Sequence, residues 1–367
     1  MTRKKVLNIG IDLGTSRSVI ACDNGIRTFV PSLVGYPKDA VSKKMFKNDI
    51  VFGDEAEKNK MALNLIKPFD KGQLKYSDTL DREKEPEKYK NTVQAARALL
   101  KHLVSLGLEE YDDMYHDDVT VRAVLGAPAL ASVKNKKTLL EIADGIIEDV
   151  MVATEPFCVA YGLGLFSNAL IIDIGAGTVD LCRMHGTIPT LEDQITTLKA
   201  GDYVDQVFFD LIMKNHPDAN FTVNMVKKFK EDNASVSGSE ETVYIDLPVK
   251  GKPTRYDVTA ELKAACRAVV PDIVDGIQKL ISSFDPEFQE GLKQNVILAG
   301  GGSQIVGLKK EIEDYMQENL GYGRVIKSEE PLYAGANGAL KLCKDMPDEY
   351  WLQIKSKGKT AAASGNN

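Results

Sequence analysis

Two short acidic turns are the parts of this sequence best suited to chemistry. They read Asp12-Leu13-Gly14-Thr15-Ser16 and Asp173-Ile174-Gly175-Ala176-Gly177-Thr178. The glycines allow a tight turn, and the backbone N–H groups that follow can surround phosphate oxygens. A carboxylate opens each turn, and Mg²⁺ accepts such oxygen ligands while keeping most of its waters. The pattern predicts polyphosphate binding, with Asp12 and Asp173 serving Mg²⁺ through water.

One turn of this kind alone is more often an ordinary hairpin. Here the turn is repeated, with Asp173 lying 161 residues (173 minus 12) after Asp12. Each copy follows an apolar segment and precedes a second one, which ends in Cys22 or Cys182. A repeat at domain spacing indicates a duplicated fold. If the halves face each other, both turns would contact the same polyphosphate.

Glu155 is the candidate catalytic residue. It stands between Thr154 and Pro156, where Thr can cap a helix and Pro suits the first helical turn. A carboxylate there could orient the water that attacks a γ-phosphate, because phosphoryl transfer depends on positioning and charge stabilisation. The alternative is a helix-start acid favoured by the helix dipole.

A third glycine segment, Gly300-Gly301-Gly302-Ser303, could let adenine and ribose approach the backbone closely. The alternative is a strand-to-helix turn in which Ser303 caps the helix. Lys227, Lys228 and Lys230 are either ligands or ordinary surface charges. The four histidines are isolated in sequence, so no metal cluster is predicted.

The elements that must position these residues alternate between strands and helices, which is typical of the α/β class. Apolar runs predict strands over 6–13, 19–22, 119–125, 169–174 and 296–299. Apolar residues at helical spacing predict helices over 88–104, 134–150, 259–284 with a kink at Pro271, and 336–342. The segment 300–303 is expected to open a helix that contains Leu308, Ile312 and Met316.

Composition sets the class of protein. The 367 residues suggest about two domains, and 43% hydrophobic with 27% charged residues is typical of a soluble protein. The net charge of −7 argues against non-specific nucleic-acid binding, which needs excess Lys and Arg. We expect the five scattered cysteines to be buried free thiols in a reducing cytoplasm. No signal peptide or membrane span is predicted. We expect a solvated loop over 109–118 and a disordered tail over 355–367.

The three glycine segments together resemble the phosphate and adenosine segments of the actin–Hsp70–sugar kinase superfamily. The stretch from Val119 to Glu155 resembles the first connecting region of that superfamily, and Tyr333-Ala334-Gly335-Ala336-Asn337-Gly338-Ala339 resembles the second. Five segments in the right order span almost the whole chain. Within the superfamily, the chain is most similar to magnetosome-associated bacterial actins. Four segments outside the nucleotide motifs carry that similarity: Val34-Gly35-Tyr36-Pro37-Lys38-Asp39, Asp193-Gln194-Ile195, Lys199-Ala200-Gly201-Asp202-Tyr203-Val204-Asp205 and Pro347-Asp348-Glu349-Tyr350-Trp351.

The resemblance implies an actin-like duplicated fold of two domains, or four subdomains, around a central nucleotide cleft. Residues 1–152 with 331–354 would form domain I, and 153–330 domain II. The implied cofactors are ATP and Mg²⁺. Asp12 and Asp173 would serve the metal, Glu155 the attacking water, and the glycine segments, with Gly201, the phosphates and adenosine. Lys230 falls near the position where relatives contact adenosine.

The resemblance further implies an ATPase that assembles into cytoplasmic filaments and positions magnetosomes through adaptor proteins. Such a protein would bind no nucleic acid and would have no membrane span of its own.

Three alternatives stay open. An Hsp70-like module would need a peptide-binding domain, and only 13 residues (355–367) follow the end of predicted domain I. A sugar kinase would carry a base Asp where this chain has Gly126-Ala127-Pro128-Ala129. A non-hydrolysing structural relative would bind nucleotide without turnover.

Overall fold

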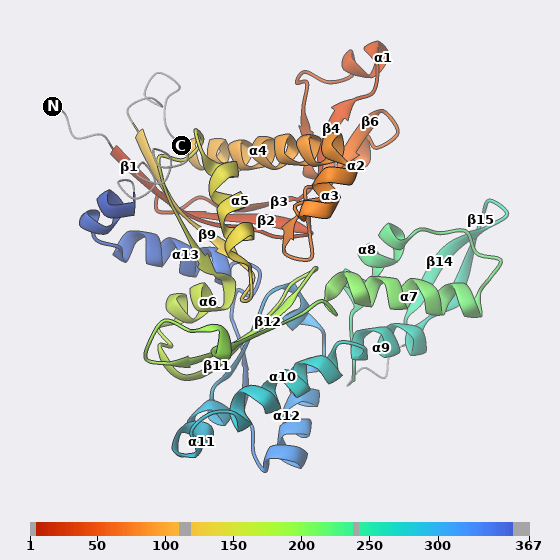
Figure 1. Cartoon of the computed structure of the whole chain (residues 1–367). Helices are drawn as coiled ribbons and strands as arrows, with labels where there is room; N and C mark the ends of the chain where they lie inside the picture. Colours follow the sequence, from red (N-terminus) through yellow and green to blue (C-terminus); the bar gives the residue numbers. More distant parts are fainter. Residues whose placement is uncertain (1–4, 110–118, 238–241, 355–367) are drawn as a thin grey trace. The chain divides into compact units, whose positions relative to one another are not determined.

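The computed structural model describes residues 5–109, 119–237 and 242–354 (Figure 1). These residues form two units, which are described separately. The first unit runs to Gly164 and resumes at Tyr333, and the second comprises Leu165–Leu332. The predicted division into domains at residues 152/153 and 330/331 stays a prediction. The expected loop over 109–118, apart from Glu109, and the expected tail over 355–367 lie outside the described residues.

The main sheet of the first unit has the strand order β10-β9-β1-β2-β3. Strands β9 and β10 run parallel to β1, whereas β2 and β3 follow it as antiparallel neighbours. Its strands are β1 (Lys5–Leu13), β2 (Arg17–Cys22), β3 (Arg27–Pro31), β9 (Val119–Ala127) and β10 (Asp149–Thr154). The helices around it are α4 (Pro86–Leu108), α5 (Val133–Ala143), α6 (Glu155–Leu163) and α13 (Ala334–Asp345).

Strand β1 sends alternate residues to opposite faces of this sheet. Leu7, Ile9 and Ile11 are fully buried in a core that also contains the apolar face of α4 and residues of α5. The other face carries Gly10 and Asp12 and is covered by α13: a Cβ atom on Gly10 would overlap backbone atoms of that helix. Glycine at position 10 therefore lets α13 approach β1.

The rest of the first unit is a smaller antiparallel sheet with the order β5-β4-β6, a β7–β8 hairpin and three short helices. The elements are β4 (Val34–Pro37), β5 (Val51–Phe52), β6 (Leu63–Ile66), β7 (Phe69–Asp70), β8 (Gln73–Leu74), α1 (Ala40–Lys43), α2 (Gly53–Lys58) and α3 (Thr79–Lys84). Leu33, Val51, Ala56 and Leu63 form a separate small core here.

The main sheet of the second unit, β13-β12-β11-β16-β17, repeats the arrangement of the first. Strands β16 and β17 are parallel to β11, and β12 and β13 are antiparallel. Asp173 on β11 is paired with Asp180 and Ala299, just as Asp12 on β1 is paired with Val19 and Gly126. The bounds are β11 (Ser167–Ile174), β12 (Val179–His185), β13 (Gln194–Thr197), β16 (Val296–Ala299) and β17 (Val325–Lys327). This repeat confirms the predicted duplicated α/β fold.

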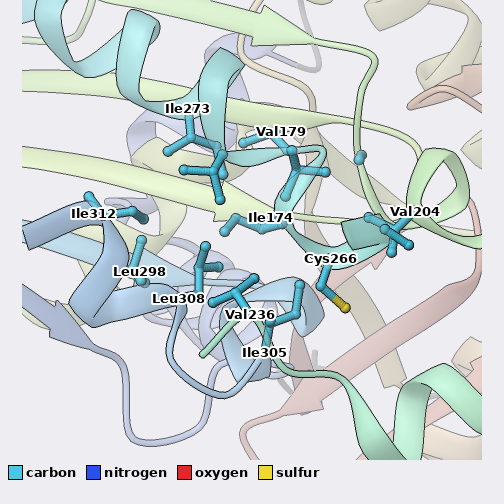
Figure 2. Close-up of a cluster of buried hydrophobic side chains, with 14 of the residues drawn as sticks. Ile174, Val179, Val204, Val236, Cys266, Ile273, Leu298, Ile305, Leu308 and Ile312 are labelled. Carbon is cyan, nitrogen blue, oxygen red and sulfur yellow. The ribbon is translucent and has the colours of Figure 1, made fainter. Parts of the chain in front are cut away.

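The helices of the second unit share one large apolar core with the sheet. Figure 2 shows Ile174 of β11 and Val179 of β12 in one cluster of buried side chains with Val204, Ile273 and Ile312, which come from three helices. The elements are α7 (Gly201–Asn215), α8 (Val223–Asn233), α9 (Thr259–Arg267), α10 (Val270–Ser282), α11 (Pro286–Gln294), α12 (Leu308–Leu320), the hairpin β14 (Tyr244–Val249) and β15 (Lys252–Asp257), and the 3₁₀ turns η2 (Leu191–Asp193) and η3 (Gly301–Gln304).

The expected strands and most expected helices are present, but the helix predicted over 134–150 is wrong in its second half. Helix α5 ends at Ala143, and Gly145 adopts a left-handed conformation with φ of 72°. The chain then enters β10, whose first residue, Asp149, pairs with Arg122 of β9. Ile147 is buried as a core residue of the connecting segment and does not belong to the helix.

The single kinked helix predicted over 259–284 is also wrong, because two helices occupy this range. Helix α9 ends at Arg267 and α10 begins at Val270. Pro271 lies in the first turn of α10, where its missing N–H costs no helical hydrogen bond. The proline therefore starts a new helix and does not bend a continuous one.

Candidate functional site

The first acidic turn lies at the end of β1 and is held by its neighbours. The Ser32 hydroxyl donates to the Gly14 carbonyl oxygen over 2.7 Å, and the Ser32 N–H donates to the Ser16 oxygen over 2.9 Å. The Gly72 N–H donates to the Thr15 hydroxyl over 3.2 Å. Ser32, directly after β3, thus holds the backbone of Gly14 and Ser16, and Gly72, between β7 and β8, holds the Thr15 side chain.

Glu155 and Asp12 both lie close to Gly126, which has no side chain to separate them. Glu155 is the first residue of α6, directly after β10, with Thr154 in the N-cap position and Pro156 in the first turn. A Cβ atom on Gly126 would lie 3.1 Å from Cγ of Glu155 and 3.8 Å from Cα of Asp12. The first unit therefore brings the predicted catalytic carboxylate and the predicted metal carboxylate to the two sides of Gly126.

The second acidic turn is closed by its own backbone. The Gly175 N–H donates to the Thr178 carbonyl oxygen over 2.9 Å, and Thr178 itself is 5% exposed. Helix α7 begins against this turn: the Gly201 N–H donates to Gly175 over 3.1 Å and the Asp202 N–H to Ala176 over 2.8 Å. A Cβ atom on Gly201 would lie 3.2 Å from Cα of Ala176, so a larger residue would push the helix away from the turn.

The glycine segment after β16 packs directly on the Asp173–Ile174 turn. Gly300 has a φ of 75°, and a Cβ atom there would overlap the Asp173 side chain and the Ile174 carbonyl oxygen. A Cβ atom on Gly302 would overlap the Ile174 side chain. Only glycine permits this packing, which places the predicted adenosine segment beside the predicted metal carboxylate of the same unit.

The prediction that this segment opens a helix, with Ser303 as the alternative cap, needs correction. Gly301–Gln304 form a 3₁₀ turn, and α12 begins only at Leu308, after Gly307. The Ser303 hydroxyl donates to the Gly300 carbonyl oxygen over 2.7 Å, inside the turn. Ser303 therefore stabilises the glycine turn itself.

Lys230 also lies in the second unit, where it forms an ion pair with Asp205, a residue that sequence reasoning missed. Its Nζ is 2.8 Å from Oδ1 of Asp205, with the lysine side chain 12% exposed and that of Asp205 2%. Burial raises the pKa of Asp205, and the Lys230 and Lys227 ammonium groups act in the opposite direction. The available signal was a lone Asp beside Val204 and Phe208 on the buried face of α7.

The predicted site residues thus fall into two groups, one in each unit. The first unit holds Asp12, Gly14, Thr15, Ser16 and Glu155. The second unit holds Asp173, the 175–178 turn, Gly201, Lys230 and the 300–303 segment. In both groups carboxylates adjoin close-packed glycine backbone, and carboxylate oxygen is the donor type that Mg²⁺ prefers. Each group therefore has the carboxylate oxygens that Mg²⁺ takes as ligands and glycine backbone that a phosphate can approach closely.

Comparison with known proteins agrees with the fold, which is that of an actin-like protein. The MreB/Mbl protein family matches residues 89–349. The actin-like protein MamK of Paramagnetospirillum magneticum is 38% identical over 351 residues, covering 96% of each chain. This chain therefore belongs to the MreB/Mbl family, and the expected similarity to the MamK-type actins is confirmed.

Two solved structures extend this similarity to the whole fold. A MamK double helical filament has a TM-score of 0.85 at 36% identity and covers 94% of this chain and 100% of its own. A non-polymerising MamK mutant bound to AMPPNP has a TM-score of 0.68 at 36% identity, covering 93% of this chain and 100% of its own.

Among the described residues, no helix is both long and apolar enough to span a membrane.

Proposed function

We propose that this protein is an ATP-dependent, filament-forming bacterial actin that hydrolyses ATP and organises magnetosomes. The observation that carries the proposal is the packing of Gly300 and Gly302 on the Asp173–Ile174 turn, which leaves no room for any side chain. The relatives support the same function, because similar solved proteins are a MamK filament and a MamK mutant bound to AMPPNP.

The residues divide the chemistry between them. Backbone N–H groups of the 14–16 and 175–178 turns would bind the phosphates, and Asp12 and Asp173 would hold Mg²⁺. The ion would supply charge neutralisation of the phosphates. Glu155 orients the water that attacks the γ-phosphate and accepts its proton. Gly201 and the 300–303 segment provide close backbone approach to the nucleoside.

The proposed cellular role follows the MamK-type relatives. The filament would lie in the cytoplasm as a cytoskeletal element and bind magnetosomes through adaptor proteins. A fluorescent fusion should form lines along the magnetosome chain, and deletion of the gene should disperse the magnetosomes seen by electron microscopy. Normal chains in the deletion strain would contradict this role while leaving the ATPase proposal intact.

The decisive biochemical experiment is substitution of Glu155. We expect Glu155→Ala to bind ATP and sediment as polymer with Mg²⁺, but to lose at least about a hundredfold in phosphate release, because general-base catalysis contributes on that order. Glu141→Ala, which changes an exposed glutamate on α5, is the matched control and should behave as wild type. Unchanged phosphate release from Glu155→Ala would remove this residue from the mechanism. Nucleotide binding without hydrolysis by the wild type would instead favour a non-hydrolysing relative.

A further inference from the structure

A buried carboxylate, Asp205, lies outside the set of residues that contact the proposed nucleotide. It occupies the second turn of α7, four residues after Gly201, and is 1% exposed. Val204, its neighbour on α7, belongs to the same core as Ile174 of the phosphate turn (Figure 2). A charge at such a position is costly unless it is paired.

Two lysines of α8 provide the pairing. Nζ of Lys230 is 2.8 Å from Oδ1 of Asp205, and Nζ of Lys227 is 3.9 Å from Oδ2. Lys227 also pairs with Asp202 over 3.1 Å. Two carboxylates of α7 thus face two ammonium groups of α8, and the charges balance. A buried pair of this kind adds little stability compared with apolar packing, so its presence needs another explanation.

The ion pair is linked to the phosphate turn through the start of α7. Besides Asp205, Nζ of Lys230 reaches the Gly201 carbonyl oxygen over 3.4 Å. The N–H groups of Gly201 and Asp202 donate to Gly175 and Ala176 of the turn. The first turn of α7 is therefore held by α8 on one side and holds the phosphate turn on the other.

The residues that follow α8 are hydrogen-bonded to the chain just after the 300–303 segment. Immediately after α8, the Val236 N–H donates to Val306 over 2.9 Å, and the Val306 N–H donates to Ala234 over 3.0 Å. Val306 lies three residues after Ser303, the last residue of the 300–303 segment. Helix α8 and the turn after it are therefore bonded to Gly201, which contacts the 175–178 turn, and to the chain that follows the 300–303 segment. The pair of Asp205 with Lys230 is a buried contact between α7 and α8.

We propose that Asp205 is a positioning residue for the nucleotide: by pairing with Lys230 it holds the 175–178 turn and the 300–303 segment in the arrangement that binds ATP. This inference rests on the proposed nucleotide-binding function. It assigns to Asp205 a role in nucleotide affinity in addition to any role in stability, although Asp205 is not among the residues predicted to contact the nucleotide.

The test compares two equally buried aspartates of the second unit. Asp205→Asn removes the charge that holds Lys230. Asp193→Asn removes the charge that pairs with Arg183 over 2.8 Å. The Asp193 side chain is 5% exposed, and this ion pair includes no residue of the predicted nucleotide segments. Binding of a fluorescent Mg–ATP analogue and urea unfolding are measured on both variants. We expect both to lose stability, whereas only Asp205→Asn weakens binding, by roughly tenfold to a hundredfold, as misplaced supporting groups do.

The outcomes separate the inference from the proposed function. Absence of analogue binding by the wild type would defeat the proposed function. Wild-type affinity in folded Asp205→Asn, with a stability loss like that of Asp193→Asn, would overturn the inference alone. If Asp205→Asn fails to fold, Lys230→Met and Lys230→Arg replace it, with hydrogen exchange measured without nucleotide. The Gly201 and Asp202 amides should exchange faster in Lys230→Met but not in Lys230→Arg, and equal protection in both would refute the positioning role.

Discussion

Single glycines decide how closely α6, α13 and β1 pack in the first unit. Gly338 of α13 lies against α6, where a Cβ atom would overlap the Cys158 carbonyl group and lie close to Gly162. Gly10 of β1 has the same relation to α13. Because backbone meets backbone at these points, no side-chain rotation can relieve an added methyl group, and the helices would have to separate.

Gly338→Ala should therefore destabilise the first unit despite the better helix propensity of alanine. We expect a loss of about 1–3 kcal/mol, the usual cost of overpacking. Gly335→Ala is the matched control in the same helix, because its Cβ would lie 3.8 Å from the nearest described atom, Oδ2 of Asp12. Urea unfolding followed by circular dichroism measures both. Equal midpoints for the two variants would show that α13 can shift at little cost.

Local residue patterns predicted the ends of β1 and β11 well and the supporting residues poorly. The turns at Asp12 and Asp173 could be located because such a turn is encoded in a few consecutive residues. The role of Asp205 could not be predicted from the sequence, because its partner Lys230 lies 25 residues away (230 minus 205) on another helix. Only the packing of α7 against α8 brings the two charges together.

At the scale of elements, the errors occurred where apolar spacing continued across a break. Ile147 falls on the helical pattern of α5 but is buried from a connecting segment, since Gly145 has already turned the chain. The helical spacing of apolar residues from Leu262 to Leu280 likewise continues past the end of α9 into α10. Both α9 and α10 bury their apolar faces in the same core, so the pattern shows no break between them. Periodicity reports burial, and burial does not require a continuous helix.

The ends of β12 and η2 are joined by a buried ion pair that makes stability depend on pH. Asp193 accepts from the Thr190 N–H over 2.8 Å and from Arg183 Nη2 over 2.8 Å, and it contacts His185 Nε2 over 3.0 Å. Burial alone would raise the pKa of Asp193, but these hydrogen bonds lower it well below its usual value. The folded state thus prefers the ionised carboxylate.

Asp193→Asn should cost about 3 kcal/mol near neutral pH, since it leaves the Arg183 charge buried without its partner. A lowered carboxyl pKa contributes stability that is present above the unfolded value of about 3.9 and is lost as pH falls toward the folded value. The stability gap between wild type and variant should therefore be constant above about pH 5 and narrow below about pH 4.

Urea titrations from pH 3.5 to pH 7 measure this gap, with Asp246→Asn on the exposed edge of β14 as the control for removal of a charge. A gap that stays constant down to the lowest pH would mean that Asp193 is not the ionised partner of Arg183.

For the whole molecule, the duplicated sheet was predictable because the repeat of Asp12 and Asp173 is visible in the sequence. All five cysteines are buried and outside any disulfide bond, as expected. Cys22, Cys158 and Cys343 lie in the first unit, and Cys182 and Cys266 in the second. Burial raises the pKa of Cys22, Cys182 and Cys343 to about 12 and that of Cys266 to about 11.

The native protein should consequently react very slowly with thiol reagents at pH 8, because the thiolate is the reactive form. Unfolding in urea should expose all five thiols. Mass spectrometry of pulse-labelled protein along a urea titration would show whether the cysteines of the two units become reactive together. Rapid labelling of Cys182 in the native protein would contradict the burial described above.

The first unit is built from two stretches of chain that are separated by the whole second unit, and α13 comes from the later stretch. During translation, Leu165–Leu332 must be made before α13 can reach β1 and α6. At about 5–20 residues per second, this delay is roughly 10–30 seconds. For that time the nascent first unit lacks the helix that covers Gly10 and Asp12, so the growing polypeptide passes through a stage that ribosome-associated chaperones are suited to protect.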